Sequence, residues 1–101
     1  MALPSKLPAL MPAIRAALEQ GDYIYSNHAL ERQNQRKITR SEVLQVLKGG
    51  HHEKAKDTYE EAYKAWNYAV RGKTGDKREL RIIVSFDPQG MLIVTAIDLK
   101  A

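Results

Sequence analysis

The sequence predicts an α+β fold in which three N-terminal helices pack on a mainly antiparallel sheet of three to four strands. Three observations lead to this prediction. Apolar residues recur at helical spacing in the first half of the chain, they alternate with polar residues in the second half, and glycine-containing turn signals separate the segments. Helices that come first and strands that follow are typical of the α+β class.

The chain has the length of one domain. Its 101 residues can bury one hydrophobic core and leave no room for a second. We therefore expect a single domain over 1–101, with an irregular lead-in over 1–11, a helical part over 12–50 and a strand part over 51–101.

The first helix is expected over residues 12–20. Pro4 and Pro8 keep the preceding segment irregular, whereas Pro12 suits the first turn of a helix, where its missing N–H costs nothing. Gly21 supplies the stop signal.

Two further helices follow, each with its own capping signal. A serine or asparagine at 26–27 can cap a helix over His28–Lys37, because a short side-chain oxygen accepts from free amides of the first turn. Thr39 and Glu42 stand at capping-box spacing before an apolar stripe that runs to Gly49.

The second half of the chain alternates with the period of a β-strand. We expect strands over Lys64–Arg71, Leu80–Phe86 and Met91–Asp98. The turn-forming segments Gly72–Asp76 and Asp87–Gly90 connect them, so consecutive strands are expected to pair antiparallel.

The segment between the glycine pair and the first long strand is less regular. His51–Asp57 can add an edge strand, and Tyr59–Ala62 can form a helical turn instead. Adjacent histidines at 51–52 suggest a metal site at first sight, but neighbouring residues point in different directions and no second cluster has ligand spacing. We expect no metal, and both histidines in solvent.

The composition indicates which cellular compartment and which kind of partner to expect. The chain has no cysteine, a net charge of +4 and a pI near 9.4, which favour a reducing cytoplasm and an anionic partner. Prolines and Arg15 interrupt the apolar N-terminal stretch, so neither a signal peptide nor a membrane segment is expected. P-loop, dinucleotide-binding, serine-hydrolase and zincin motifs are absent, so no small-molecule cofactor is expected.

The second predicted helix carries the most informative polar pattern. His28, Arg32 and Arg36 are four residues apart and form one stripe with a titratable imidazole and two permanent cations. Guanidinium groups bind phosphate oxygens, and a histidine can transfer a proton near neutral pH. The alternative is a solvated basic face, for which Glu31 and Glu42 are available as ion-pair partners.

Polar residues also interrupt the predicted strands. They are Lys64, Asn67, Arg71, Arg81 and Ser85. They form either a basic binding surface or the ordinary solvent face of an antiparallel sheet. Thr95 stands in the most apolar stretch, so its hydroxyl is either hydrogen-bonded structurally or presented to a site. Trp66 and Tyr68 fit core packing better than base stacking.

The run from Tyr25 to Gly50, YSNHALERQNQRKITRSEVLQVLKGG, resembles a known family pattern. It is similar to the aromatic-S-x-H-A-x-x-R-x-x-x-R-x-I-T sequence of the bacterial domain of unknown function 4258 family. That family looks like a distant branch of the barnase, EndoU, colicin and RelE ribonucleases and toxins. The resemblance implies a RelE-like fold and a toxin-like, metal-independent endoribonuclease.

The resemblance also implies roles for individual residues. The expected catalytic residues are His28, Arg32, Arg36, Arg81 and Thr95, with His28 as the proton-transfer group. The expected RNA contacts are Lys64 and Arg71, which the resemblance also matches, and Asn67, which lies on the polar face of the predicted sheet. RNA or the ribosome is the expected substrate, and a cognate antitoxin the expected protein partner.

Two alternatives to the nuclease remain open. One is a non-catalytic basic module that binds nucleic acid or an acidic protein. The other is a DNA-binding helix-turn-helix made by the second and third helices, which the apolar residues Val43, Leu44 and Leu47 disfavour.

Overall fold

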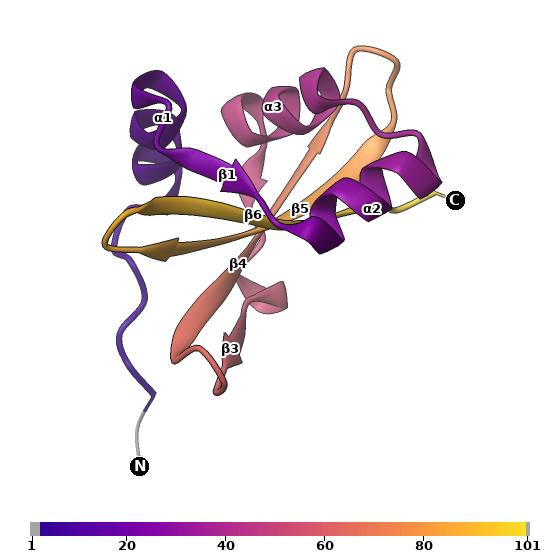
Figure 1. Cartoon of the computed structure of the whole chain (residues 1–101). Helices are drawn as coiled ribbons and strands as arrows, with labels where there is room; N and C mark the ends of the chain where they lie inside the picture. Colours follow the sequence, from indigo (N-terminus) through magenta and orange to yellow (C-terminus); the bar gives the residue numbers. More distant parts are fainter. Residues whose placement is uncertain (1–2, 101) are drawn as a thin grey trace.

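The computed structural model describes residues 3–100, which form three α-helices, one 3-10 turn and six strands (Figure 1). The helices are α1 (Leu10–Gln20), α2 (Asn27–Arg36), α3 (Arg40–Gly49) and the 3-10 turn η1 (Lys54–Lys56). The strands are β1 (Tyr23–Tyr25), β2 (His51–His52), β3 (Thr58–Glu60), β4 (Ala65–Lys73), β5 (Glu79–Asp87) and β6 (Gly90–Asp98).

The strands form one mixed sheet in the order β1-β6-β5-β4-β2, with β3 also paired to β4. The long strands β4, β5 and β6 are antiparallel as expected, whereas β1 runs parallel to β6. The prediction of a mainly antiparallel sheet of three to four strands was therefore wrong, although the chain is α+β. Strands of two or three residues are too short to show alternation, and the pairing of β1 with β6 joins distant parts of the chain.

The α1 helix starts two residues earlier than predicted, and residues 3–9 before it are irregular. Pro12 lies in its first turn. Gly21 ends it in the left-handed region at φ 71°, which glycine adopts without strain. The alternative of a helical turn over Tyr59–Ala62 does not hold for Tyr59 and Glu60, which pair with β4 as part of β3; residues 61–62 lie in the turn that follows.

Both predicted caps are confirmed. The Ser26 hydroxyl accepts a hydrogen bond from the Ala29 amide at 2.9 Å, and α2 begins one residue earlier than expected. At α3 the Thr39 hydroxyl accepts from the Glu42 amide, and the Glu42 carboxylate accepts from the Thr39 amide. This reciprocal pair satisfies two amides that the helix itself leaves unbonded.

The core lies between the sheet and the helices. Its largest fully buried side chains come mainly from α3 and the long strands: Ile14, Val43, Val46, Leu47, Val70, Leu80, Ile82, Val84, Met91 and Ile93. Alternate residues of β5 are buried, as the sequence pattern predicted. Tyr68 is 4% exposed and Trp66 packs against the same cluster, which confirms core packing for both. Among residues 3–100, no helix could cross a membrane.

Candidate nucleic-acid interface

The α2 helix is fixed along the outer edge of β6. The first half of that edge pairs with β1, and the second half is covered by α2 (Figure 1). Ser26 donates from its amide to the Ile93 carbonyl at 2.9 Å and from its hydroxyl to the Val94 carbonyl at 2.7 Å. At the other end of α2, Arg36 donates to the Ala96 carbonyl at 2.9 Å. These bonds satisfy backbone groups that an uncovered edge strand would expose.

The three stripe residues on α2 therefore have different surroundings. His28 is exposed, and its side chain makes no hydrogen bond or ion pair within the described residues. One turn further, Arg32 donates to the Gln35 side chain at 3.1 Å on the surface. Arg36 is partly buried, and its hydrogen bond to the β6 backbone gives it a structural role. The first two side chains are free to meet a ligand, and the third can do so only with its remaining N–H groups.

Positive charge is concentrated on α2 and the start of α3. In residues 27–41, four arginine or lysine side chains make no ion pair with any described carboxylate: Arg32, Arg36, Lys37 and Arg40. The segment contains one acidic residue, Glu31, which is exposed. Arg40 lies over the ring of Tyr25, 5.2 Å from its centroid. We call His28 and these four cations the α2 basic segment.

The arginines of the sheet, Arg71 on β4 and Arg81 on β5, form ion pairs with glutamates. Arg81 Nε lies 2.6 Å from a Glu53 oxygen, and Arg71 bonds both Glu79, at 2.8 Å, and Glu53, at 3.2 Å. The hydrogen bond from Arg81 is the main reason that the pKa of Glu53 lies below its usual range. Similarly, the hydrogen bond from Arg71 lowers the pKa of Glu79. A phosphate at this face has to compete with two ionised carboxylates.

The remaining predicted residues are spread over the sheet. Thr95 is opposite Ile83, beside an irregularity in the β5–β6 pairing, and is partly exposed. Its hydroxyl has no hydrogen-bond partner among residues 3–100. Asn67 is half-buried opposite Thr58, and Lys64 is exposed in the turn before β4.

The structure brings some of these groups together and leaves others apart. Arg36 binds the carbonyl next to Thr95, so these two share one edge of β6. Arg81 lies one strand away, opposite Ile97. Within the described part of the chain, no hydrogen bond or ion pair joins His28 to Arg81 or Thr95.

Sequence reasoning missed a buried carboxylate at Asp57. Its side chain is 0% exposed and accepts from the Ala69 amide at 2.9 Å and from Lys6 at 3.0 Å, and it lies 2.7 Å from His52 Nε2. The prediction that both histidines are solvated was wrong for His52, whose side chain is 14% exposed. No local pattern marks Asp57, since two of its partners are 12 and 51 residues away.

This cluster has a structural explanation. Asp57 replaces a missing ladder partner of β4 where η1 separates β2 from β3. Lys6 also lies over the Trp66 ring, and the Leu7 amide donates to the Tyr68 hydroxyl at 2.9 Å. The cluster therefore ties the N-terminal lead-in to β4. Residues 3–100 contain no group of three or more side chains suited to hold a metal ion.

Comparison with known proteins identifies the family. The family model described as a domain of unknown function (DUF4258) matches residues 25–98. The chain belongs to the DUF4258 family. No curated protein and no solved structure matches it. The DUF4258 match begins at Tyr25 and includes α2, α3 and the three long strands, so the α2 basic segment and Thr95 both lie inside the family domain.

Proposed function

We propose that this DUF4258 protein is an RNA-directed domain that contacts RNA through the α2 basic segment. The observation that carries the proposal is the distribution of paired and unpaired charge. Arginines on the sheet are neutralised by Glu53 and Glu79, whereas the cations of residues 27–41 have no carboxylate partner among residues 3–100.

Free guanidinium groups favour a phosphate backbone as the ligand. Arginine holds phosphate oxygens with paired hydrogen bonds, and each phosphate contact releases a condensed counterion. Binding through this segment is therefore strongly salt-dependent. A net charge of +4 supplies the long-range attraction that brings a polyanion to the surface.

A second candidate function is toxin-like cleavage of the bound RNA, and the free imidazole of His28 favours it. His28 Nδ1 or Nε2 would accept the proton of a ribose 2′-hydroxyl, whose oxygen attacks the adjacent phosphorus. The bond to the 5′-oxygen breaks, leaving a 2′,3′-cyclic phosphate, and solvent protonates the leaving oxygen. Arg32 would stabilise the charge on the phosphate. Such an enzyme would act in the cytoplasm and require restraint by an antitoxin.

Binding is tested by fluorescence anisotropy with a labelled single-stranded RNA over a range of salt concentrations. We expect Arg32→Ala to weaken binding several-fold and to reduce the salt slope by about one counterion. Arg15→Ala, on α1, removes the same charge from an exposed residue outside the segment and should have a small effect. Equal effects of the two substitutions would show that only net charge matters and would overturn the proposal.

Cleavage is tested separately, in the presence of a chelator and with and without ribosomes. Products with a 2′,3′-cyclic phosphate that disappear in His28→Ala, while RNA binding is retained, would support catalysis. Intact RNA with the wild-type protein, or cleavage that persists in His28→Ala, would leave the protein as a non-catalytic RNA-binding module.

A further inference from the structure

The β1 strand has one open edge. The backbone carbonyl of Asp22 accepts a hydrogen bond from the Met91 amide at 2.8 Å, and the Ser26 amide donates to the Ile93 carbonyl at 2.9 Å. Backbone N–H and C=O groups alternate in direction along a strand. Those of residues 22, 24 and 26 therefore point towards β6, and those of Tyr23 and Tyr25 point away from it. Neither tyrosine has a backbone partner on that side within residues 3–100.

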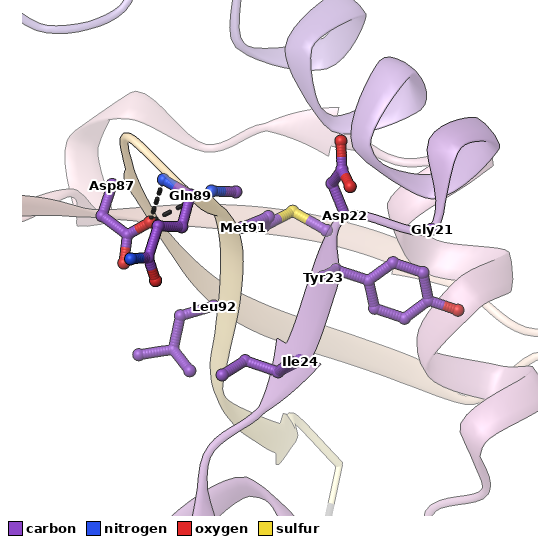
Figure 2. Close-up of a pocket in the computed structure, with 9 residues that line it drawn as sticks. Gly21, Asp22, Tyr23, Ile24, Asp87, Gln89, Met91 and Leu92 are labelled. Carbon is purple, nitrogen blue, oxygen red and sulfur yellow. Dashed lines mark hydrogen bonds between the residues drawn. The ribbon is translucent and has the colours of Figure 1, made fainter.

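The middle of this edge is apolar. Ile24 is 67% exposed, although it is a large aliphatic residue. Figure 2 shows it beside Leu92, its partner on β6, with the Tyr23 ring turned to the other side of the strand. Sheets commonly protect an edge by keeping the edge strand very short, or with a charged side chain, a proline or a bulge. The three-residue strand β1 has only the first of these protections, and it presents an isoleucine.

The two ends of β1 have opposite electrostatic character. Asp22 precedes the strand, is exposed and makes no ion pair with any described residue. It lines a pocket of about 360 Å³ together with a second carboxylate, Asp87. The strand is followed by the N-terminus of α2, where the helix dipole is positive and His28 is exposed.

We propose that β1 pairs antiparallel with β1 of a second copy of this chain. A twofold axis at Ile24 places the Asp22 end of each strand beside the α2 N-terminus of the other copy, so both ends are complementary at once. Tyr23 and Tyr25 of each copy then exchange about four backbone hydrogen bonds with Tyr25 and Tyr23 of the other. The two Ile24 side chains meet in a close, non-hydrogen-bonded pair.

The arrangement favours a second copy over an unrelated strand, because the same edge supplies both the acidic and the positive end. A three-residue strand forms a small interface, so the dimer is weak and is expected at protein concentrations on the order of 100 μM. This inference is argued from the open edge of β1 and does not require RNA binding, although the positive end of the interface includes His28 of the α2 basic segment.

Sedimentation velocity of the full chain over a concentration series tests the association. The wild type should shift from monomer to dimer, and Ile24→Lys should remain monomeric with an unchanged thermal midpoint, because position 24 is exposed. A wild type that stays monomeric throughout, or an Ile24→Lys variant that dimerises equally well, would overturn the proposal.

A cysteine pair tests the register. The chain has no cysteine, so Ile24→Cys introduces a single thiol at the twofold axis, where paired Cβ atoms are close enough for a disulfide. Tyr63→Cys, at a residue that is 82% exposed in the turn before β4, is the matched control. Under mild oxidation we expect Ile24→Cys to form linked dimers at least about tenfold faster than Tyr63→Cys. Equal rates would refute the β1 pairing.

Discussion

Replacing Arg78 with methionine should destabilise the protein more than any other single loss of charge near α2. The guanidinium of Arg78 bonds two carboxylates, Glu42 at 3.1 Å and Asp98 at 2.9 Å. It also donates to the carbonyls of Arg36 at 3.0 Å and Lys37 at 3.2 Å, at the C-terminal end of α2. One side chain therefore joins the end of α2, the start of α3 and the last strand.

The magnitude follows from how much water reaches these groups. The side chain of Arg78 is 27% exposed, that of Glu42 is 11% exposed and that of Asp98 is 13% exposed. Removing one partner of a fully buried ion pair costs about 3–5 kcal/mol, and a solvent-exposed pair contributes about 1 kcal/mol or less. For this intermediate case we expect Arg78→Met to lower the free energy of unfolding by about 2–3 kcal/mol at pH 7. Methionine keeps the apolar part of the side chain, so the loss of stability measures the contribution of the guanidinium group.

The loss should depend on pH. Burial by itself would raise the pKa of Glu42, but hydrogen bonds from the Thr39 amide and from Arg78 outweigh it and hold that pKa below its usual value of 4.5. A carboxyl group with a lowered folded-state pKa stabilises the protein fully above the unfolded pKa. That stabilisation is lost as the pH falls through the folded pKa. The difference between wild type and Arg78→Met should therefore shrink below pH 4.5.

Urea unfolding at pH 7 and in acid measures both effects. Arg32→Met is the matched control, since Arg32 bonds only the Gln35 side chain at the surface and its loss should cost less than about 0.5 kcal/mol. A loss for Arg78→Met no greater than that of the control would refute the reasoning, as would a loss that does not change with pH.

Three further substitutions test other parts of the fold, each by urea or thermal unfolding. Gly90→Ala should cost about 2–4 kcal/mol, because φ is +144° and the new Cβ would lie 2.4 Å from the Asp22 carbonyl oxygen, whereas Gly49→Ala meets no atom within 4 Å and should be neutral or stabilising. Asp57→Ala should cost about 3 kcal/mol by removing the buried carboxylate that the Ala69 amide, Lys6 and His52 share, whereas Asp76→Ala, at an exposed turn, should cost less than about 0.5 kcal/mol. Leu47→Ala should cost about 2–5 kcal/mol, since this core side chain is 0% exposed. If the free energy of unfolding falls by less than about 1 kcal/mol in Gly90→Ala, Asp57→Ala or Leu47→Ala, the structural reason given for that substitution is wrong.

Local signals predicted the helices and the long strands well. Ser26, Thr39 and Glu42 cap their helices through bonds over three residues, so the sequence alone contains both partners. The alternation in β5 survives in the structure because one face of that strand is covered by the helices and the other is not. These features depend on spacing within a few residues, which a single sequence displays.

The candidate site was only partly accessible to the same reasoning. The stripe on α2 follows from helical spacing; in the structure His28 is exposed and Arg32 is partly exposed. Spacing could not show that Arg36 is bound to β6 or that Arg81 is paired with Glu53, 28 residues away. Whether an arginine is free for a ligand depends on partners that only the folded chain brings close.

The sequence alone contains the order of the three helices and the three long strands, the caps of α2 and α3 and the apolar face that each of these elements buries, because these features depend on backbone preferences and on the periods of 3.6 and 2 residues. Tertiary structure alone decided the parallel pairing of β1 with β6, the burial of Asp57 and the division of the arginines into paired and unpaired sets. Those features arise from contacts between groups far apart in the chain, whose free energy depends on distance and desolvation in three dimensions.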